Sequence, residues 1–217
     1  ASIKPVQRIG LIDYGMGNLH SVQRSFERLN QPLFHVRNPR DLETCDALIL
    51  PGVGAFDPAM EKLHTSGLVE PLRSWHEQSR PLLGICLGLQ LLFERSDEGC
   101  SEGLGLFQGR VQRLPDQHGE RIPHMGWGQL NRQQPCPLLP DAEAKPWVYF
   151  VHSYAAVPDK ASDRAATVSF GKAEATAMVW KNRTGACQFH PEKSAKAGAQ
   201  LLKHWITWLQ CGAPQPQ

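Results

Sequence analysis

Short apolar runs alternate with segments of helical periodicity through the first half of the chain, and this alternation constrains the fold more than any other feature. A β-α-β series of this kind predicts a parallel sheet covered by helices on both faces. Ligand chemistry is then expected at the carboxyl ends of the strands. The predicted strands are residues 8–12, 33–36, 46–50 and 81–85, and the helical segments among them are 18–29 and 57–78, the second broken near Gly67 and Pro71.

After residue 109 the pattern changes to a succession of strands, which predicts an antiparallel section joined to the parallel core. A final helix follows, with Ser194 as its expected cap and Gly212 as its end. The predicted fold class is therefore α/β, with a largely parallel central sheet flanked by helices and antiparallel strands in the C-terminal half. Residues 1–217 are expected to form one domain, with frayed ends at 1–7 and 213–217. The strands of this half are predicted at 110–114, 147–157, 166–170 and 176–189, the last interrupted by a turn at 182–185.

The composition suits a chain that builds an apolar core. Hydrophobic residues make up 41% of the 217 residues, charged residues make up 20%, and the formal net charge is +2. This balance does not favour a polybasic binder of nucleic acid. The longest apolar stretch, 81–93, contains Gln90 and two glycines and is too short to cross a bilayer, so no membrane span is expected. The sequence shows no signal-peptide pattern, which favours a cytoplasmic location.

The sequence shows no motif for a metal or a nucleotide cofactor. Its six cysteines form no CxxC and no Cys/His cluster at the spacing of zinc ligands. The glycines at 15 and 17 follow a predicted strand, but His20 replaces the third glycine of a dinucleotide fingerprint, and no P-loop occurs. We therefore expect no cofactor. In a reducing compartment most of the cysteines are best explained as buried thiols.

One cysteine has a context that points to chemistry: Gly84-Ile85-Cys86-Leu87-Gly88 follows a predicted strand and precedes a helical pattern. The segment has the form of a nucleophile elbow with cysteine at its centre. Side chains at 84 or 88 would collide with neighbouring backbone in so sharp a turn. The thiol would lie at the positive end of a helix dipole, which favours the reactive thiolate, and the Leu87 N–H would point at an oxyanion. The alternative is a buried cysteine between two packing glycines.

A thiolate nucleophile needs a base and a group that orients the base, and His190-Pro191-Glu192 offers both. Pro191 favours an extended conformation at His190, in which residues two apart point to the same side, so Glu192 can meet an imidazole nitrogen. An isolated His-x-Glu is usually an accident of the surface. This one ends a predicted strand and precedes a helix, as the elbow does, so we interpret Cys86, His190 and Glu192 as a candidate triad.

Another glycine-rich segment, Pro51-Gly52-Val53-Gly54, comes directly after the predicted strand 46–50. Glycines on both sides of Val53 allow positive φ and free N–H groups, so this loop could complete an oxyanion hole. A tight β-to-α turn explains the same residues equally well. The residues alone leave both interpretations open.

Three segments together resemble the class I, Cys-His-Glu, glutamine amidotransferases: LPGVGAF (50–56), GICLGLQLLFERSDEG (84–99) and FHPEKS (189–194). Within that class, the chain is similar to the glutaminase subunits of imidazole glycerol phosphate synthase, from histidine biosynthesis, in DYGMGNLHSV (13–22), the PGVG form of the loop, PHMGW (123–127) and YFVHSY (149–154). The resemblance covers roughly residues 8–209. Departures are small: Leu89 stands where methionine is common, and Cys187 where valine or threonine is usual, which we interpret as a buried strand residue.

The resemblance implies a reaction in which Cys86 attacks the γ-carboxamide of L-glutamine, His190 passes the thiol proton to departing ammonia, and Glu192 orients His190. Water then cleaves the glutamyl thioester. The other site residues are implied by their positions in the family motifs. Gly52, Val53 and Leu87 would form the oxyanion hole, and the amino acid end of glutamine would be held by Gln90, Glu98, His152, Ser153 and Tyr154.

The resemblance also implies a partner, a separate (β/α)8-barrel cyclase that takes up the ammonia in a heterodimer. We expect the isolated chain to hydrolyse glutamine poorly, because an always-active site would waste it. Because glycines flank Val53, the Gly52–Val53 peptide could rotate, so that it presents its C=O to the oxyanion hole in the resting state and its N–H in the active state. The residues that match the family's docking face are Asn18, Met125, Trp127, Tyr149 and Lys193.

Three other functions fit the residues less well than a glutaminase. A stand-alone cysteine hydrolase or peptidase on a similar fold would leave Gln90 and Glu98 unexplained. A non-catalytic scaffold would not need an intact candidate triad. An amidotransferase of another pathway would normally carry PGG in place of Pro51-Gly52-Val53-Gly54.

Overall fold

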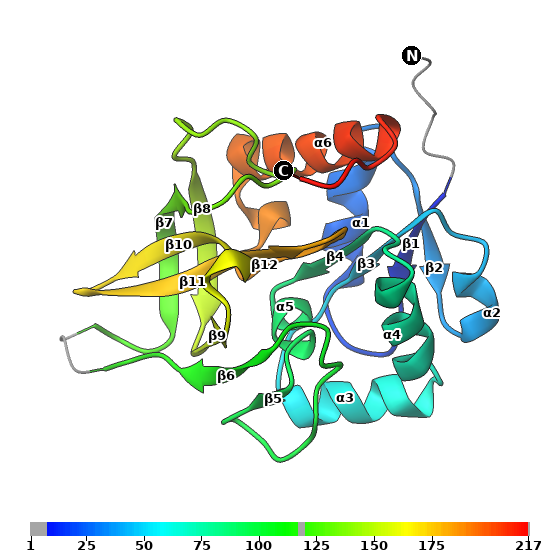
Figure 1. The fold of residues 1–217 in the computed structure, drawn as a ribbon, viewed down its shortest axis with the longest axis horizontal. Helices are drawn as coiled ribbons and strands as arrows, with labels where there is room; N and C mark the ends of the chain where they lie inside the picture. The colour runs from blue at the N-terminus through cyan, green and yellow to red at the C-terminus, as the bar shows by residue number, and fades with distance from the viewer. Residues whose placement is uncertain (1–7, 117–119, 217) are drawn as a thin grey trace.

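A large mixed sheet runs through the molecule, with helices on both of its faces (Figure 1). The structure is a computed structural model, and it describes residues 8–116 and 120–216. In chain order the elements are β1 (Ile9–Ile12), α1 (Leu19–Glu27), β2 (Leu33–Val36), α2 (Pro39–Leu42), β3 (Ala47–Leu50), α3 (Phe56–Thr65), α4 (Val69–Glu77), β4 (Leu82–Ile85), α5 (Leu87–Leu91), β5 (Arg95–Ser96), β6 (Gly109–Arg113), β7 (His124–Arg132), β8 (Trp147–His152), β9 (Tyr154–Pro158), η1 (Ala161–Asp163), β10 (Arg164–Phe170), β11 (Ala173–Lys181), β12 (Thr184–Cys187), η2 (Pro191–Lys193) and α6 (Ala195–Gln210).

The large sheet has nine strands in the order β2-β1-β3-β4-β12-β11-β10-β7-β8. From β2 to β12 neighbouring strands are parallel, and from β12 to β8 they are antiparallel. A small sheet, β5-β6-β9, lies beside it. The predicted fold class, a largely parallel core with antiparallel strands added in the C-terminal half, is therefore confirmed.

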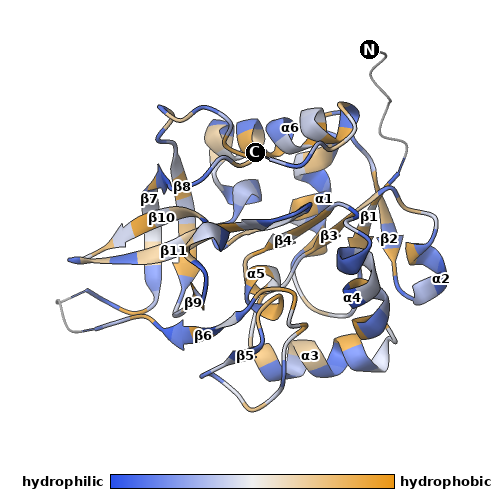
Figure 2. Cartoon of the chain, viewed as in Figure 1, coloured by the Kyte–Doolittle hydropathy of each residue, from blue (hydrophilic) through white to orange (hydrophobic). Residues whose placement is uncertain are grey.

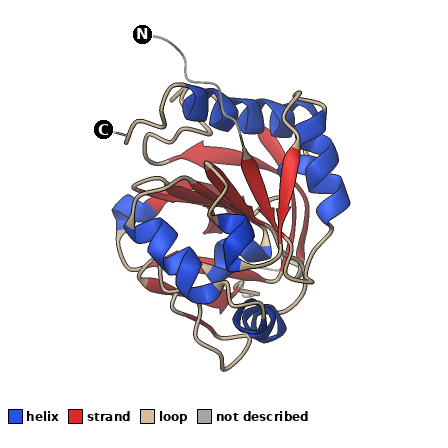
Figure 3. Cartoon of the chain, turned by 90° about the vertical axis from the view of Figure 1, so that its right-hand side faces the viewer, coloured by secondary structure: helices blue, strands red, loops and turns tan. Residues whose placement is uncertain are grey.

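The large sheet separates two apolar cores, because successive side chains of a strand point to opposite faces. In β3, Ala47 and Ile49 belong to one core, and Leu48 and Leu50 belong to the other. Helices α1 and α6 contribute side chains to the first core, and α3, α4 and α5 contribute to the second, so the helices form layers on both sides of the strands (Figure 3). Figure 2 shows apolar residues along the central strands β3 and β4.

The four predicted parallel strands are found within a residue of their expected limits. Some other details differ from expectation. The predicted break is found near Gly67, between α3 and α4, but Pro71 does not break the helix, because it lies in the first turn of α4, where an N–H has no helical partner to lose. The strand expected at 147–157 is divided at Ser153 into β8 and β9, which join different sheets. Strand β7 was not predicted, since Gly126 and Gly128 weaken a strand pattern. A Cβ at Gly128 would lie 2.6 Å from Val168, so close packing explains this glycine.

The C-terminal segment differs from expectation at both of its ends. Ser194 precedes α6, but its hydroxyl donates to the carbonyl of His190 at 2.6 Å and accepts from the N–H of Tyr149 at 2.9 Å, so it braces the His190 segment rather than capping the helix. The frayed end expected at 213–217 is wrong for Ala213 and Pro214. Ala213 is buried, and the Trp208 indole donates to the Pro214 carbonyl at 2.7 Å. Residues 1–7 and 217 lie outside the described part of the chain.

Candidate active site

The candidate nucleophile and base lie side by side because their strands are neighbours. Strands β4 and β12 pair in parallel, with Ile85 opposite Cys187, and the Cys86 N–H donates to the Cys187 carbonyl at 2.8 Å. Cys86 therefore leaves β4 at the level where the chain leaves β12 toward His190. Both segments are at the carboxyl edge of the parallel strands, where the β-α-β pattern predicts ligand chemistry. Cys187 itself is buried in β12, as expected.

The elbow at Cys86 has the strained backbone of a nucleophile presented from a sheet. Cys86 has φ 57° and ψ −114° and stands directly before α5, and a positive φ is unusual for a residue with a side chain. A Cβ at Gly88 would collide with the carbonyl oxygen of Leu50, and one at Gly84 would lie 3.0 Å from the Cβ of Ala186. The two glycines are thus needed for the reason the sequence indicated.

His190 and Glu192 form a buried pair. The His190 Nδ1–H donates to Glu192 Oε1 at 2.6 Å, and their side chains are 4% and 5% exposed. Burial alone lowers the pKa of His190, but interactions with Cys86 and Glu192 outweigh it and raise the pKa to about 9. The imidazole is therefore cationic at neutral pH, which favours the thiolate at Cys86. The turn η2, begun by Pro191, brings Glu192 back to its histidine.

Residues 51–54, called here the oxyanion loop after their expected role, contact the first turn of α5 through a backbone hydrogen bond. The Leu87 N–H donates to the carbonyl oxygen of Gly52 at 3.1 Å. The Gly52–Val53 peptide thus presents its C=O to the donor that an oxyanion would need, which is the orientation expected at rest. Gly54 has φ +97°, a conformation that favours glycine. Val53 is 39% exposed at the mouth of the site.

A cavity of about 390 Å³ opens at Cys86 and brings together the residues expected to bind glutamine. Gln90, Glu98, His152, Ser153 and Tyr154 all line it, and so does Lys193, which was expected at the docking face. Val53 and Gly54 of the oxyanion loop also line the cavity, as do Pro123 and Val151, which were not predicted as site residues. Val151 alternates with the buried residues of β8, so the period of the strand was the signal that could have found it.

Two polar groups of the cavity are already held by the protein. Gln90 Nε2 donates to the Tyr154 carbonyl at 3.2 Å and to Gln188 Oε1 at 3.1 Å. Glu98 Oε1 accepts the N–H of Phe56, the first residue of α3, at 2.8 Å, which leaves Oε2 for a ligand. Burial lowers the pKa of His152 to about 4, so its ring is neutral and its Nδ1–H donates to the Tyr154 carbonyl at 2.8 Å.

An exposed apolar face adjoins this cavity on β7 and β8. Met125 is 64% exposed and Trp127 is 51% exposed, and Trp127 lies opposite Tyr149 in the strand register. Trp147, 56% exposed, extends the face and was not predicted, although it is two residues from Tyr149 on the same strand. Asn18 is exposed before α1. Large apolar side chains gathered on one face in this way are typical of an interaction surface.

A second hollow is larger but carries a different set of groups. It measures about 730 Å³, and its walls come from β5, β6 and the loop at 102–105, with Arg73, Arg95 and Arg110 among them. Within the described residues, no three metal-ligating side chains come together, and no helix is long and apolar enough to cross a membrane. The elbow, the buried His–Glu pair and the cavity at Cys86 therefore mark the candidate active site.

The fold and this site define an α/β enzyme with a Cys-His-Glu arrangement, and comparisons with known proteins agree. The family model "Glutamine amidotransferase class-I" matches residues 10–207. A relative from Prochlorococcus marinus (strain MIT 9313), "Imidazole glycerol phosphate synthase subunit HisH 2", is 64% identical over 96% of this chain and 98% of its own. One from Synechococcus sp. (strain CC9605), "Imidazole glycerol phosphate synthase subunit HisH", is 62% identical over 94% and 96%.

Solved structures show the same fold at low identity. A crystal structure of a glutamine amidotransferase has a TM-score of 0.73 at 19% identity and covers 95% of this chain and 100% of its own. The structure of PurLQS from Thermotoga maritima has a TM-score of 0.74 at 17% identity, over 95% and 99%. The chain belongs to the class I glutamine amidotransferases, in the family of HisH subunits. It is therefore an enzyme of the glutamine amidotransferase class.

Proposed function

We propose that this chain is the glutaminase subunit of an imidazole glycerol phosphate synthase and that it hydrolyses L-glutamine to glutamate and ammonia. The observation that carries the proposal is the buried His190–Glu192 pair beside the Cys86 elbow, at a cavity that also contains Gln90 and Glu98. The names of relatives at 60–64% identity support the same activity. A stand-alone cysteine hydrolase finds no support among them.

The reaction follows from the charges of the three side chains. The Cys86 thiolate attacks the carbonyl carbon of the glutamine side chain, and the carbonyl oxygen becomes an oxyanion. Protonated His190 then gives its proton to the departing nitrogen, so ammonia leaves and a thioester remains on Cys86. His190, now neutral, takes a proton from the water that attacks the thioester, and glutamate leaves. Glu192 keeps Nδ1 protonated throughout, which holds the ring in one orientation.

Substrate recognition in this proposal uses the polar groups that line the cavity. The Glu98 carboxylate suits the ammonium group of glutamine, and its Oε2 is not used by the Phe56 N–H. Gln90 and the segment at 152–154 lie across the cavity, where they can contact the amino acid end of the substrate. The fixed partners of Gln90 keep its side chain in one place before substrate arrives, which reduces the entropy lost on binding.

The ammonia is proposed to pass to a separate (β/α)8-barrel cyclase in a cytoplasmic heterodimer. That subunit makes imidazole glycerol phosphate and aminoimidazole carboxamide ribonucleotide, a lyase step that lies outside this chain. The exposed face of Met125, Trp127 and Tyr149, extended by Trp147, has the aromatic character of an interface core. Lys193 lies at the edge of the cavity, and Asn18 is exposed at the start of α1. Residues 1–217 are proposed to act as one domain around the large sheet.

The bond between Leu87 and Gly52 supports a subunit that has low activity until the cyclase binds. A hole that lacks one donor typically loses about 10² to 10³ in rate. Here the Leu87 N–H donates to the Gly52 carbonyl, and the Val53 N–H points away from Leu87 because it is trans to that carbonyl in the same peptide. We propose that binding of the liganded cyclase favours rotation of the Gly52–Val53 peptide, which frees Leu87 and adds a second N–H.

The test is glutamine turnover by the purified chain, alone and with the cyclase and its ligand. We expect low turnover alone, a rise of about 10² or more on addition of both, and none from Cys86→Ala in either state. An active Cys86→Ala protein would falsify the glutaminase proposal. Full turnover in the isolated chain would instead remove the resting state and leave the nucleophile in place.

A further inference from the structure

The segment at 14–17 lies directly on the oxyanion loop. The Tyr14 hydroxyl donates to the Pro51 carbonyl at 2.7 Å, and Tyr14 is buried. A Cβ on Gly17 would lie 3.4 Å from the Cα of Gly52, so the two backbones are in contact. The first two residues of the oxyanion loop therefore pack against this segment, and the Tyr14–Pro51 hydrogen bond joins the two.

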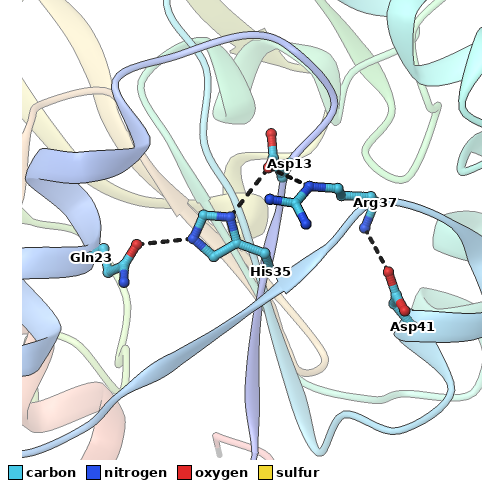
Figure 4. A network of polar contacts seen from close by, with 5 residues as sticks. All are labelled: Asp13, Gln23, His35, Arg37 and Asp41. Carbon is cyan, nitrogen blue, oxygen red and sulfur yellow. Dashed lines mark hydrogen bonds and ion pairs between the residues drawn. The ribbon is translucent and has the colours of Figure 1, made fainter.

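The residue before Tyr14 is fixed by a polar network that joins three elements (Figure 4). The Asp13 carboxylate contacts Nδ1 of His35, in β2, at 3.2 Å and accepts from Nε of Arg37, the residue after β2, at 3.0 Å. His35 Nε2 contacts Gln23 of α1 at 2.9 Å, and the Arg37 N–H donates to Asp41 of α2 at 3.1 Å. Tyr14 thus follows a residue that is hydrogen-bonded to two neighbouring segments, and its own hydroxyl reaches the oxyanion loop.

The chain beyond the loop is held as well, two residues after Gly54, where the Phe56 N–H donates to Glu98 Oε1. Between these two holds lie Gly52, Val53 and Gly54, whose glycines permit backbone rotation. Gly52 is bonded to Leu87 in this state, and Val53 is partly exposed. The loop is thus anchored on both sides of the peptide that has to turn.

We propose that Tyr14 is a positioning residue for glutamine hydrolysis: its hydroxyl fixes the Pro51–Gly52 peptide, so that the change of state is confined to the Gly52–Val53 peptide. The inference rests on the proposed function and deepens it. A single peptide plane rotates between fixed neighbours by opposite changes of ψ at Gly52 and φ at Val53, which leaves the path of the chain unchanged. The Val53 N–H then arrives in one place, as a preorganised oxyanion donor must.

Two features of the contact agree with this role. A Cβ at Gly52 would lie 2.7 Å from the Tyr14 hydroxyl oxygen, so the tyrosine and the glycine fit each other. Burial, together with the negative charge of Cys86, raises the pKa of the Tyr14 phenol above its usual range. The phenol therefore stays protonated and remains a hydrogen-bond donor throughout the working pH range.

The test is Tyr14→Phe, which removes the hydroxyl and keeps the ring. With the cyclase and its ligand present, we expect kcat for glutamine hydrolysis to fall about five- to tenfold, the effect of one buried hydrogen bond, while KM for glutamine stays within about twofold. A merely structural role would instead lower thermal stability without this split between kcat and KM. An unchanged kcat in a folded Tyr14→Phe protein would overturn the inference.

The matched control is Thr184→Val, which removes a buried side-chain hydrogen bond, 2.6 Å from Thr184 Oγ1 to His76 Nδ1, at the far end of β12. We expect it to lower stability comparably and to leave stimulated kcat unchanged. A kcat loss in Thr184→Val equal to that in Tyr14→Phe would also overturn the inference. Activity in Cys86→Ala is the separate sign that the proposed function itself is wrong.

A second variant covers the case in which Tyr14→Phe does not fold. Asp13→Asn keeps the shape of a partly exposed side chain but weakens its hold on His35 and Arg37. Because Asp13 acts on the loop through Tyr14, we expect a smaller fall in stimulated kcat, about two- to threefold, again with KM unchanged. No fall in kcat, or a change confined to KM, would overturn the inference.

Discussion

Replacing Glu192 with glutamine tests the buried pair most directly. Glu192→Gln keeps the size of the side chain and removes its charge 2.6 Å from His190 Nδ1. Burial lowers the pKa of His190, and Cys86 and Glu192 both raise it, so loss of the carboxylate lowers this pKa and reduces the cationic share of the ring near neutral pH. The variant is expected to lose both stability and the cation that assists the thiolate.

The size and the pH dependence of the stability loss follow from the pKa of His190. The shift from the ordinary 6.5 to about 9 corresponds to about 3 kcal/mol, which Glu192 shares with Cys86. Removal of one partner from a buried ion pair typically costs about 3 to 5 kcal/mol. Because the folded pKa is raised, this stabilisation is fully present below pH 6.5 and is lost as the pH rises through about 9. The wild type should therefore exceed Glu192→Gln most at low pH.

The assay is urea unfolding of both proteins at about pH 6 and about pH 10, with glutamine turnover measured in the presence of the cyclase. The control is Glu70→Gln, which breaks an exposed 2.6 Å contact with Arg73 and should cost about 1 kcal/mol or less at either pH. A stability difference between wild type and Glu192→Gln that is the same at both pH values would refute the reasoning. So would a loss no larger than that of Glu70→Gln.

Three further outcomes are expected. A glutamine-like electrophile should label Cys86 and leave the exposed Cys100 unmodified, and mass spectrometry that finds the label on Cys100 would contradict the assignment of the nucleophile. Gly88→Ala should lower the free energy of unfolding by at least about 2 kcal/mol, because its Cβ meets the Leu50 carbonyl; normal stability in urea would argue against the elbow geometry. Trp127→Ala and Trp147→Ala should each weaken cyclase binding about tenfold or more in calorimetry, and unchanged affinity in both would exclude this face as the docking surface.

Local patterns were sufficient to predict the elements that surround Cys86. Four residues of unbroken apolar character, such as those of β3 and β4, indicate buried parallel strands, and glycines at 84 and 88 indicate the elbow. The pairing of β4 with β12 is different, because it joins residues about a hundred positions apart. It could be inferred from the roles of Cys86 and His190 together, but no propensity of either segment predicts it.

The remaining differences arise where tertiary packing overrides local preference. Strand β7 carries two glycines that weaken a strand by themselves, and its pairing with β8 and β10 supplies the order that the sequence does not indicate. The hydroxyl of Ser194 has the position of a helix cap, yet the backbone of β8 and His190 competes for it successfully. In both cases the partner that decides the conformation is distant in sequence.

The proposed resting state of the site also depends on contacts between segments that are distant in sequence. The structure places Cys86 at the elbow before α5 and pairs His190 with Glu192. In the proposed mechanism the group still needed is a donor for the oxyanion, because the Gly52 carbonyl accepts the Leu87 N–H. Control of the proposed reaction then requires no movement of the triad. It requires the turning of one peptide in a loop whose two sides are anchored, one by Tyr14 and the other by Glu98, so a partner that contacts the nearby surface can act on rate without rebuilding the chemistry.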